Sequence, residues 1–238
     1  MSITEALFRP LLAAGPGQPL ITHYDDAAGT RVELSVATIA NWAAKTANWL
    51  RDEHDVEPGD QVAVLLPAHW QTAGVLLGAW WCGAAVTDDP NGAKVAFVTP
   101  GGAAPGADVV AIASLHAMGL GLGAQPAGGA VDYLDDVRLH GDDFVPLAPV
   151  TGGTCALGKS TVDEVVAEAR SRAKTLGIGR DSRVLSTVEW TMPDGVLNGF
   201  LAVLAGGGSL VQCTNVDPEQ LPARRAAEKT NIDLGGPA

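Results

Sequence analysis

The chain has 238 residues, of which 47 % are hydrophobic and 18 % are charged, which is typical of a folded globular protein rather than a disordered one. Acidic residues outnumber basic ones by 27 to 15, giving a net charge of -12 at pH 7. That balance argues against a broad nucleic-acid-binding surface, because neutralising phosphates requires a basic stripe. The apolar run 61–87 is interrupted by Pro67, His69 and Gln71, so the helix behind it is shorter than the ~20 residues of a membrane span.

Short strands and helices alternate along the first half of the chain. Ser35 is a good N-cap for a helix that ends at Asp52. The apolar residues of this helix fall on one face, at Val36, Ile39, Ala40, Ala43, Ala47 and Leu50. A second helix is expected over 69–82, and the Gly- and Pro-rich segments 100–107 and 119–129 are expected to be loops. The predicted strands of this half are 19–24, 31–34, 61–66, 84–86, 95–98 and 109–112.

The second half continues the same alternation. A helix is predicted over 161–176, with apolar positions at Val162, Val165, Val166, Ala169, Ala173 and Leu176. Strands over 184–188 and 209–212 enclose a helix over 196–205. Asp217 is expected to cap a last helix, with Pro218 at its first position and Gln220 completing a capping box. These elements predict a single α/β domain over 1–238, with a mixed, largely parallel sheet flanked by helices and an internal loop boundary near 119–150.

One segment carries the residues of a phosphate-binding loop. Residues 151–161 read T-G-G-T-C-A-L-G-K-S-T, and 153–160 fit the Walker A pattern G-x-x-x-x-G-K-S. In that pattern backbone amides face phosphate oxygens, the lysine balances the outer phosphates and the serine holds magnesium. The segment in front of it contains Pro146 and Pro149, which cannot donate to the ladder of a central strand.

The same residues also fit a purely structural interpretation. Ser160 and Asp163 have the spacing of a capping box in front of an apolar helical face. In this interpretation the glycines form a turn and Lys159 is a solvated cation, so that no ligand is needed.

A third interpretation rests on the order of segments along the chain. Residues 34–50 precede V-E-P-G-D-Q-V-A-V-L-L-P, residues 75–86 read V-L-L-G-A-W-W-C-G-A-A-V, and D-S-R-V-L-S at 181–186 is followed by F-L-A-V-L-A-G-G-G-S at 200–209. With the helix that follows Asp217, these segments resemble the amino-terminal part of the large domain of the adenylate-forming superfamily, the acyl-CoA synthetase and luciferase-like AMP-binding enzymes. The resemblance covers nearly the whole chain and implies the fold of that subdomain.

In this register 151–160 falls on the family's phosphate loop, T-S-G-T-T-G-x-P-K-G. The resemblance therefore implies nucleotide or phosphate binding by Thr151, Gly153, Thr154 and Lys159, with ATP or AMP as the ligand. The Walker A pattern adds Ser160 to these candidate residues. Two hydroxyls of the family loop are lost, which weakens the cradle for the phosphates. The positions that depart from the family loop are Gly152, Cys155, Ala156, Gly158 and Ser160.

Other motifs of the family have no counterpart. The family's aromatic or histidine element falls at 189–193, where no histidine stands. The adenine-contacting aromatic-Gly-x-Thr-Glu segment, the ribose-binding aspartate, the hinge and the small domain with its catalytic lysine find no match either. Acyl-adenylate formation depends on groups positioned against the α-phosphate. We therefore expect no catalytic residue, and a pseudoenzyme that acts as a binding or interaction module. The alternatives are one half of a split acyl-adenylating enzyme, or an ATPase that uses the 153–160 loop.

Cysteines, histidines and tryptophans bear on metal, compartment and partners. Cys82, Cys155 and Cys213 lie far apart and no two histidines are spaced i, i+3 or i, i+4, so we expect small buried thiols, no metal site and a cytoplasmic protein. The six tryptophans are expected to pack in the core. The alternative is an exposed aromatic patch on which a second copy of the chain or a protein partner covers the face that truncation leaves bare. No nucleic acid and no membrane span are expected.

Overall fold

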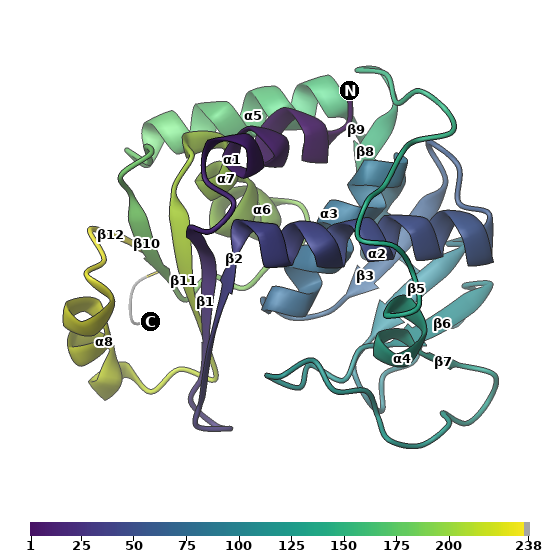
Figure 1. Cartoon of the computed structure of the whole chain (residues 1–238), viewed down its shortest axis with the longest axis horizontal. Coiled ribbons are helices and arrows are strands. Elements are labelled where there is room, and N and C mark those ends of the chain that lie inside the picture. The colour runs from purple at the N-terminus through teal and green to yellow at the C-terminus, as the bar shows by residue number, and fades with distance from the viewer. Residues whose placement is uncertain (236–238) are drawn as a thin grey trace.

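The strands form two sheets that lie side by side in a computed structural model, which describes residues 1–235 (Figure 1). The first sheet has the order β12-β10-β11-β1-β2 and comprises β1 (Pro19–Asp25), β2 (Thr30–Ser35), β10 (Arg183–Ser186), β11 (Ser209–Thr214) and β12 (Ile232–Leu234). The second has the order β7-β6-β5-β3-β4-β8-β9 and comprises β3 (Gln61–Leu65), β4 (Ala85–Thr87), β5 (Val95–Val98), β6 (Val109–Ile112), β7 (Val131–Asp132), β8 (Cys155–Leu157) and β9 (Ser160–Thr161).

Within both sheets neighbouring strands run parallel, except for the antiparallel pairs β1–β2 and β8–β9. The predicted mixed, largely parallel α/β architecture is therefore confirmed. The strands are divided between two sheets, whereas the sequence pattern led us to expect one. In both sheets the parallel pairs join strands whose connection contains a helix or a long crossover, as parallel pairing requires.

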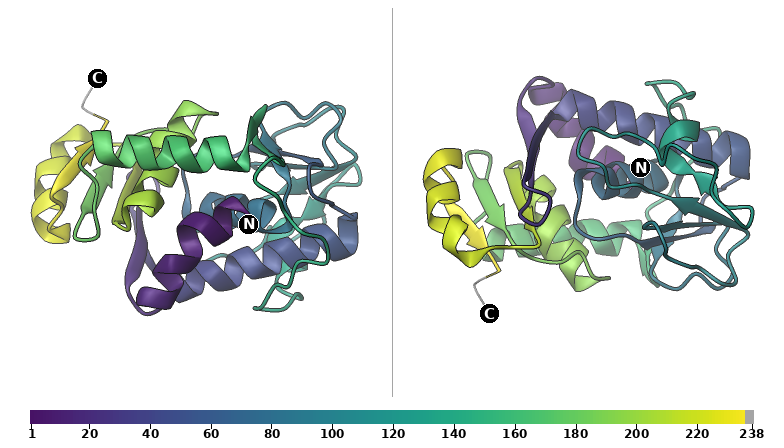
Figure 2. Two further views of the ribbon diagram at one scale, coloured as in Figure 1. Left: turned by 90° about the horizontal axis from the view of Figure 1, so that it is seen from above. Right: turned by 90° about the horizontal axis from the view of Figure 1, so that it is seen from below.

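Helices cover the sheets and fill the space between them. They are η1 (Thr4–Phe8), α1 (Arg9–Ala14), α2 (Val36–His54), α3 (Trp70–Cys82), α4 (Tyr133–Val137), α5 (Val162–Thr175), α6 (Asp194–Val196), η2 (Leu197–Leu201), α7 (Ala202–Gly206), η3 (Pro218–Gln220) and α8 (Leu221–Glu228). Seen from above, η1 and α1 lie between α5 on one side and α2 on the other (Figure 2). No helix of residues 1–235 is long and apolar enough to cross a membrane.

The centre of the molecule is the helix pair α2 and α3. Ser35 caps α2, with its side chain accepting a hydrogen bond from Thr38 N as predicted, and every apolar position expected on its inner face is buried. The two axes come close at Gly78, where a Cβ atom would lie 2.5 Å from Thr46 Cβ. Every residue of α3 is buried, which is the signature of a helix surrounded by protein.

The apolar core runs without interruption from one sheet to the other. Leu20 of the first sheet and Val95 of the second belong to the same cluster of buried side chains. The expected core packing of the tryptophans is confirmed, because Trp42 is half-buried and the other five are buried. No tryptophan within residues 1–235 is exposed, so the alternative of an exposed tryptophan patch was wrong.

Besides the capping box expected at Ser160 and Asp163, the following local predictions were wrong. The capping box after Asp217 is not formed: Gln220 Nε2 donates to the Asp217 carboxylate at 3.1 Å, and Asp217 N–H donates instead to Asp26 at 2.7 Å. The expected helix 196–205 is broken by a π-helical turn and begins at Asp194. Cys155 is an exposed thiol, although Cys82 and Cys213 are buried as expected.

Candidate functional site

The segment singled out by its sequence folds as a β-hairpin in front of α5. Strands β8 and β9 pair through Cys155–Thr161 and Leu157–Ser160, and Gly158 turns the chain between them with φ of +56°. The hairpin extends the second sheet, because Gly158 N donates to Val86 O at 2.8 Å. A Walker loop needs consecutive amides that turn toward one point. Extended backbone in the middle of this segment does not provide them.

The first two threonines of the segment, Thr151 and Thr154, are hydrogen-bonded to each other. Thr151 N donates to Thr154 Oγ1 at 3.2 Å, and the two hydroxyl oxygens lie 3.1 Å apart. Thr154 N completes the turn by donating to Thr151 O at 3.1 Å. In a phosphate loop these hydroxyls and amides would face the ligand, whereas here they satisfy one another.

Two carboxylates occupy the start of α5, beside the hairpin. Asp163 N donates to Gly152 O at 3.0 Å, and a Cβ atom at position 152 would lie 2.1 Å from Asp163 Oδ2. A side chain at position 152 would require the Asp163 carboxylate to move. Glu164 Oε2 accepts from Thr161 N at 2.8 Å, and hydrogen bonds from the Thr161 backbone and side chain lower the pKa of Glu164. Negative charge thus already lies at the helix end that favours it.

These contacts correct the predicted capping box. The helix begins one residue later than expected, so that Thr161 is the N-cap and Glu164 its partner, in place of Ser160 and Asp163. Both pairs have the same spacing in the sequence. Thr161 becomes the N-cap because it is the last residue of β9, where it pairs with Cys155, so the helix can begin only after it. Val162 N, the first amide of the helix, donates to Thr154 O at 2.9 Å.

The structure divides the five predicted ligand residues into two groups. Thr151, Gly153 and Thr154 share the turn at the base of the hairpin, while Lys159 and Ser160 lie at its far end. The three residues of β8 separate the groups, a length of about 10 Å at 3.3 Å per residue. Lys159 is exposed and makes no ion pair within residues 1–235.

Residues 189–193, on which the family's aromatic or histidine element is expected to fall, contain a packed tryptophan. Trp190 is buried and stacks on Phe200 with ring centroids 4.7 Å apart. Gly199 makes room for it, since a Cβ atom there would lie 2.9 Å from Trp190 Nε1.

Sequence reasoning missed a pair of histidines that the fold brings together. The rings of His23, on β1, and His69, the N-cap of α3, are 4.3 Å apart at an interplanar angle of 71°. Both side chains are buried. Burial is the main cause that lowers the pKa of His23 to about 4 and that of His69 to about 3, so both rings are neutral at pH 7. His69 Nδ1 accepts from Gln71 N at 3.1 Å, and His23 Nε2 lies 3.1 Å from Thr214 Oγ1.

The histidine pair lies in the wall of a hollow of about 460 Å³. The hollow is formed where β1, β3 and β6 end, the edge of open α/β sheets at which ligands bind. Its rim is the segment 115–118, which Gln71 holds at two points: Gln71 Nε2 donates to His116 O at 3.0 Å, and Leu115 N donates to Gln71 Oε1 at 3.3 Å. The sequence did contain a signal, because His23 is near the end of one predicted strand and His69 follows another.

No group of three or more His, Cys, Asp or Glu side chains within residues 1–235 is arranged to hold a metal ion. The hairpin and the hollow are separate features, because no residue of 151–160 lines the hollow. The hairpin therefore offers an exposed cation and the hollow offers neutral imidazoles.

No protein-family model matches the chain. It is 44 % identical over 237 residues to a "TIGR03089 family protein" of Mycobacterium tuberculosis (strain ATCC 25618 / H37Rv), and the match covers 96 % of each protein.

Solved structures share the fold at low sequence identity. An acyl-CoA synthetase of Brucella canis superposes with a TM-score of 0.78 at 18 % identity, covering 100 % of this chain and 47 % of that one. The anthranilate CoA ligase AuaEII gives a TM-score of 0.76 at 14 % identity, covering 99 % of this chain and 49 % of the ligase. A benzoate CoA ligase of Burkholderia xenovorans LB400 gives 0.74 at 15 %, covering 99 % and 50 %. The chain thus spans about half the length of these proteins, and the predicted resemblance is confirmed for the fold.

Proposed function

The chain belongs to the TIGR03089 family, and we propose that it is a catalytically incomplete protein with the fold of adenylate-forming enzymes, acting as a binding or interaction module. The observation that carries this proposal is the internal hydrogen bonding at the base of the hairpin, where Thr151 and Thr154 bond to each other. Its threonine hydroxyls are 3.1 Å apart and bonded to each other. A phosphate cradle has to present such groups to the ligand.

Charge at the same place adds to the argument. The carboxylate of Asp163 lies against Gly152, and the carboxylate of Glu164 accepts a hydrogen bond from Thr161 N. A polyphosphate at the hairpin would meet two negative side chains in the first turn of α5, and like charges at close range repel. The dipole of the helix, which would otherwise attract phosphate, is already used by these two carboxylates.

The test is a pyrophosphate-exchange assay with pure protein, Mg-ATP and a panel of carboxylic acids. We expect no exchange above the protein-free blank with any acid. Exchange that is lost in Lys159→Ala would contradict the proposal, because it would show that the hairpin works as a phosphate loop. Lys174→Ala is the matched control, an exposed lysine on α5 outside the hairpin.

Nucleotide binding without catalysis is a second candidate, favoured by the exposed and unpaired Lys159. In this case ATP or AMP binds through Thr151, Gly153, Thr154, Lys159 and Ser160. Calorimetric titration with Mg-ATP and with AMP decides it. Heat at millimolar nucleotide that disappears in Lys159→Ala supports a site at the hairpin, and its absence removes both this candidate and the ATPase.

A third candidate is one half of a split acyl-adenylating enzyme, favoured by the coverage of 47 % to 50 % of the solved ligases. Affinity purification from the native host followed by mass spectrometry tests it, with recovery of a polypeptide resembling the remaining half as the supporting result. Light scattering on the pure protein tests the homodimer, which a monomer mass removes. Free thiols at all three cysteines fit a cytoplasmic protein, and cell fractionation tests that placement.

A further inference from the structure

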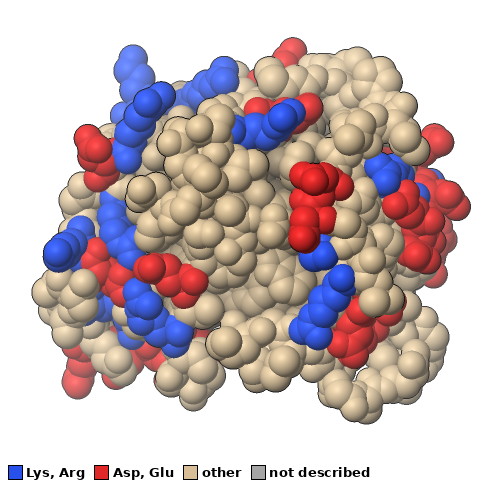
Figure 3. Space-filling view, viewed as in Figure 1, with Lys and Arg blue, Asp and Glu red and all other residues tan. Residues whose placement is uncertain are grey.

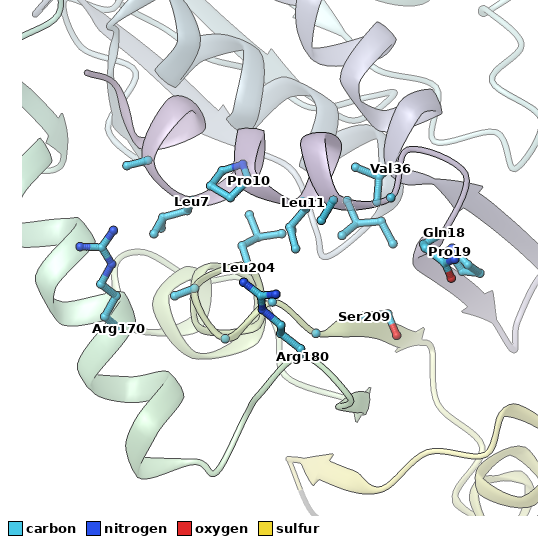
Figure 4. A pocket seen from close by; sticks show the side chains of 18 residues that line it. Leu7, Pro10, Leu11, Gln18, Pro19, Val36, Arg170, Arg180, Leu204 and Ser209 are labelled. Carbon is cyan, nitrogen blue, oxygen red and sulfur yellow. The ribbon is translucent and has the colours of Figure 1, made fainter.

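A second cavity lies at the opposite end of the first sheet from the histidine pair. It measures about 480 Å³ and is bordered by the first residues of β1 and β11, by η1 and α1, and by the end of α7 (Figure 4). Its walls are apolar where Leu7, Leu11 and Leu204 face one another. The volume falls within the range of about 300–1,000 Å³ that small-molecule sites occupy.

Two arginines line this cavity and are exceptional in the chain. Neither Arg170 nor Arg180 forms an ion pair or a side-chain hydrogen bond within residues 1–235, although the chain carries an excess of acid. Every other arginine pairs with an aspartate or glutamate: Arg9, Arg31, Arg51, Arg138, Arg172, Arg183, Arg224 and Arg225. The two arginines without an ion pair in the described part of the chain therefore both line the same cavity.

Arg170 extends from α5 and Arg180 from the segment between α5 and β10, and both side chains point toward the N-terminal helical segment (Figure 4). Arg180 lies against bare backbone, because Gly207 has φ of +82° and a Cβ atom there would approach Arg180 Cγ to 3.1 Å. The face of the molecule that carries α5 and α1 shows several basic side chains and few acidic ones near the upper left of Figure 3. The field at the cavity mouth thus favours an anion.

We propose that this cavity binds an organic anion, with an apolar body against Leu7, Leu11 and Leu204 and its acidic character recognised by the unpaired guanidinium groups of Arg170 and Arg180. A guanidinium presents a planar fork of donors that matches the oxygens of carboxylate, phosphate or sulfonate. The apolar walls supply the remaining affinity through burial of the ligand body. The site is independent of the 151–160 hairpin, none of whose residues lines it.

The test uses two fluorescent probes with the same aromatic body. 8-Anilinonaphthalene-1-sulfonate carries the acidic group, and N-phenyl-1-naphthylamine lacks it. We expect the native protein to bind the sulfonate more tightly than the neutral amine. The double variant Arg170→Gln, Arg180→Gln should weaken binding of the sulfonate about tenfold or more, because two charge-assisted contacts are lost. Lys174→Gln removes a charge from the same helix outside the cavity and should leave the Kd unchanged.

Competition with 4-phenylbutyrate and with 4-phenylbutyl phosphate identifies the acidic group that the site prefers. Ala14→Trp, at the exposed end of α1, fills the cavity and should abolish binding of both probes. Circular dichroism establishes that each variant is folded, which is expected since Arg170, Arg180 and Ala14 are all exposed. Equal affinity of the sulfonate for the native protein and the double variant, or unchanged binding in Ala14→Trp, would overturn the proposal.

Discussion

The buried histidine pair should make the stability of this protein fall steeply in mild acid. The folded protein holds the pKa of His23 at about 4 and that of His69 at about 3, against the ordinary histidine value of 6.5 that applies to the unfolded chain. Because the unfolded chain accepts protons first as the pH drops, it is stabilised relative to the folded state. The stability that the neutral rings contribute is complete above pH 6.5 and is lost progressively toward pH 4 and pH 3.

The magnitude follows from these values. Between pH 7 and pH 5 each imidazole should lower the free energy of unfolding by about 2 kcal/mol, and the pair by about 4 kcal/mol. That is a large part of the 5–15 kcal/mol that holds a typical domain together. Urea unfolding followed by tryptophan fluorescence at a series of pH values measures it, because the slope against pH counts the protons taken up on unfolding.

Two substitutions isolate the pair. His69→Asn keeps an acceptor for Gln71 N, and His23→Gln keeps a polar atom near Thr214 Oγ1, so each replaces an imidazole with a group that does not titrate. Each single variant should remove about half of the pH dependence, and the double variant nearly all of it. A smaller dependence remains from His54, whose pKa burial also lowers. Met118→Leu, on the rim of the same hollow, is the control and should retain the native slope.

Retention of the native slope by the double variant would refute the reasoning, since the protons would then bind elsewhere. So would a native protein that loses less than about 1 kcal/mol between pH 7 and pH 5, because one ring with a lowered pKa would by itself account for about 2 kcal/mol.

Two further predictions concern stability and are measured by chemical denaturation. Arg224→Ala should cost about 3–5 kcal/mol because it leaves Asp26, its buried partner at 2.6 Å, without a counter-charge; Arg225→Ala, in an exposed pair at 2.7 Å, should cost less than about 1 kcal/mol. Thr161→Ala should lower the free energy of unfolding by about 1 kcal/mol through loss of the helix cap, whereas Ser160→Ala should be nearly neutral. A larger loss in Ser160→Ala than in Thr161→Ala would instead support the capping box formed by Ser160 and Asp163.

Elements with strong local signals were predictable. The helix α2 combines a capping serine with a complete apolar face; it begins as predicted and ends at His54, two residues beyond the predicted end at Asp52. The strands β5 and β6 are short apolar runs whose limits agree with the predictions. Local pattern fails where two adjacent residues offer the same signal. Ser160 and Thr161 are each followed by an acid three residues later, and only the strand in front of them decides between the two.

Features that depend on distant pairing were not predictable from the sequence. The short strand β8 exists because Leu157 pairs with Val86, and β12 because Ile232 pairs with Val184. The division into two sheets has the same origin. For the candidate sites, the residue types of the hairpin were visible in the sequence, but the bonding of Thr151 to Thr154 is a property of the turn.

The double hydrogen bond from Gln71 to the 115–118 segment has a consequence for how this protein can diversify. The Gln71 side chain, on the buried helix α3, pairs with the backbone of this surface segment as a neighbouring strand would. It accepts a hydrogen bond from Leu115 N and donates one to His116 O. Neither sheet contributes to that attachment. A substitution at position 71 would therefore remove these two hydrogen bonds and leave the one from Trp70 Nε1 to Ala117 O at 3.2 Å. The rim of the hollow could thus be loosened by evolution or by a protein engineer while the sheets stay paired.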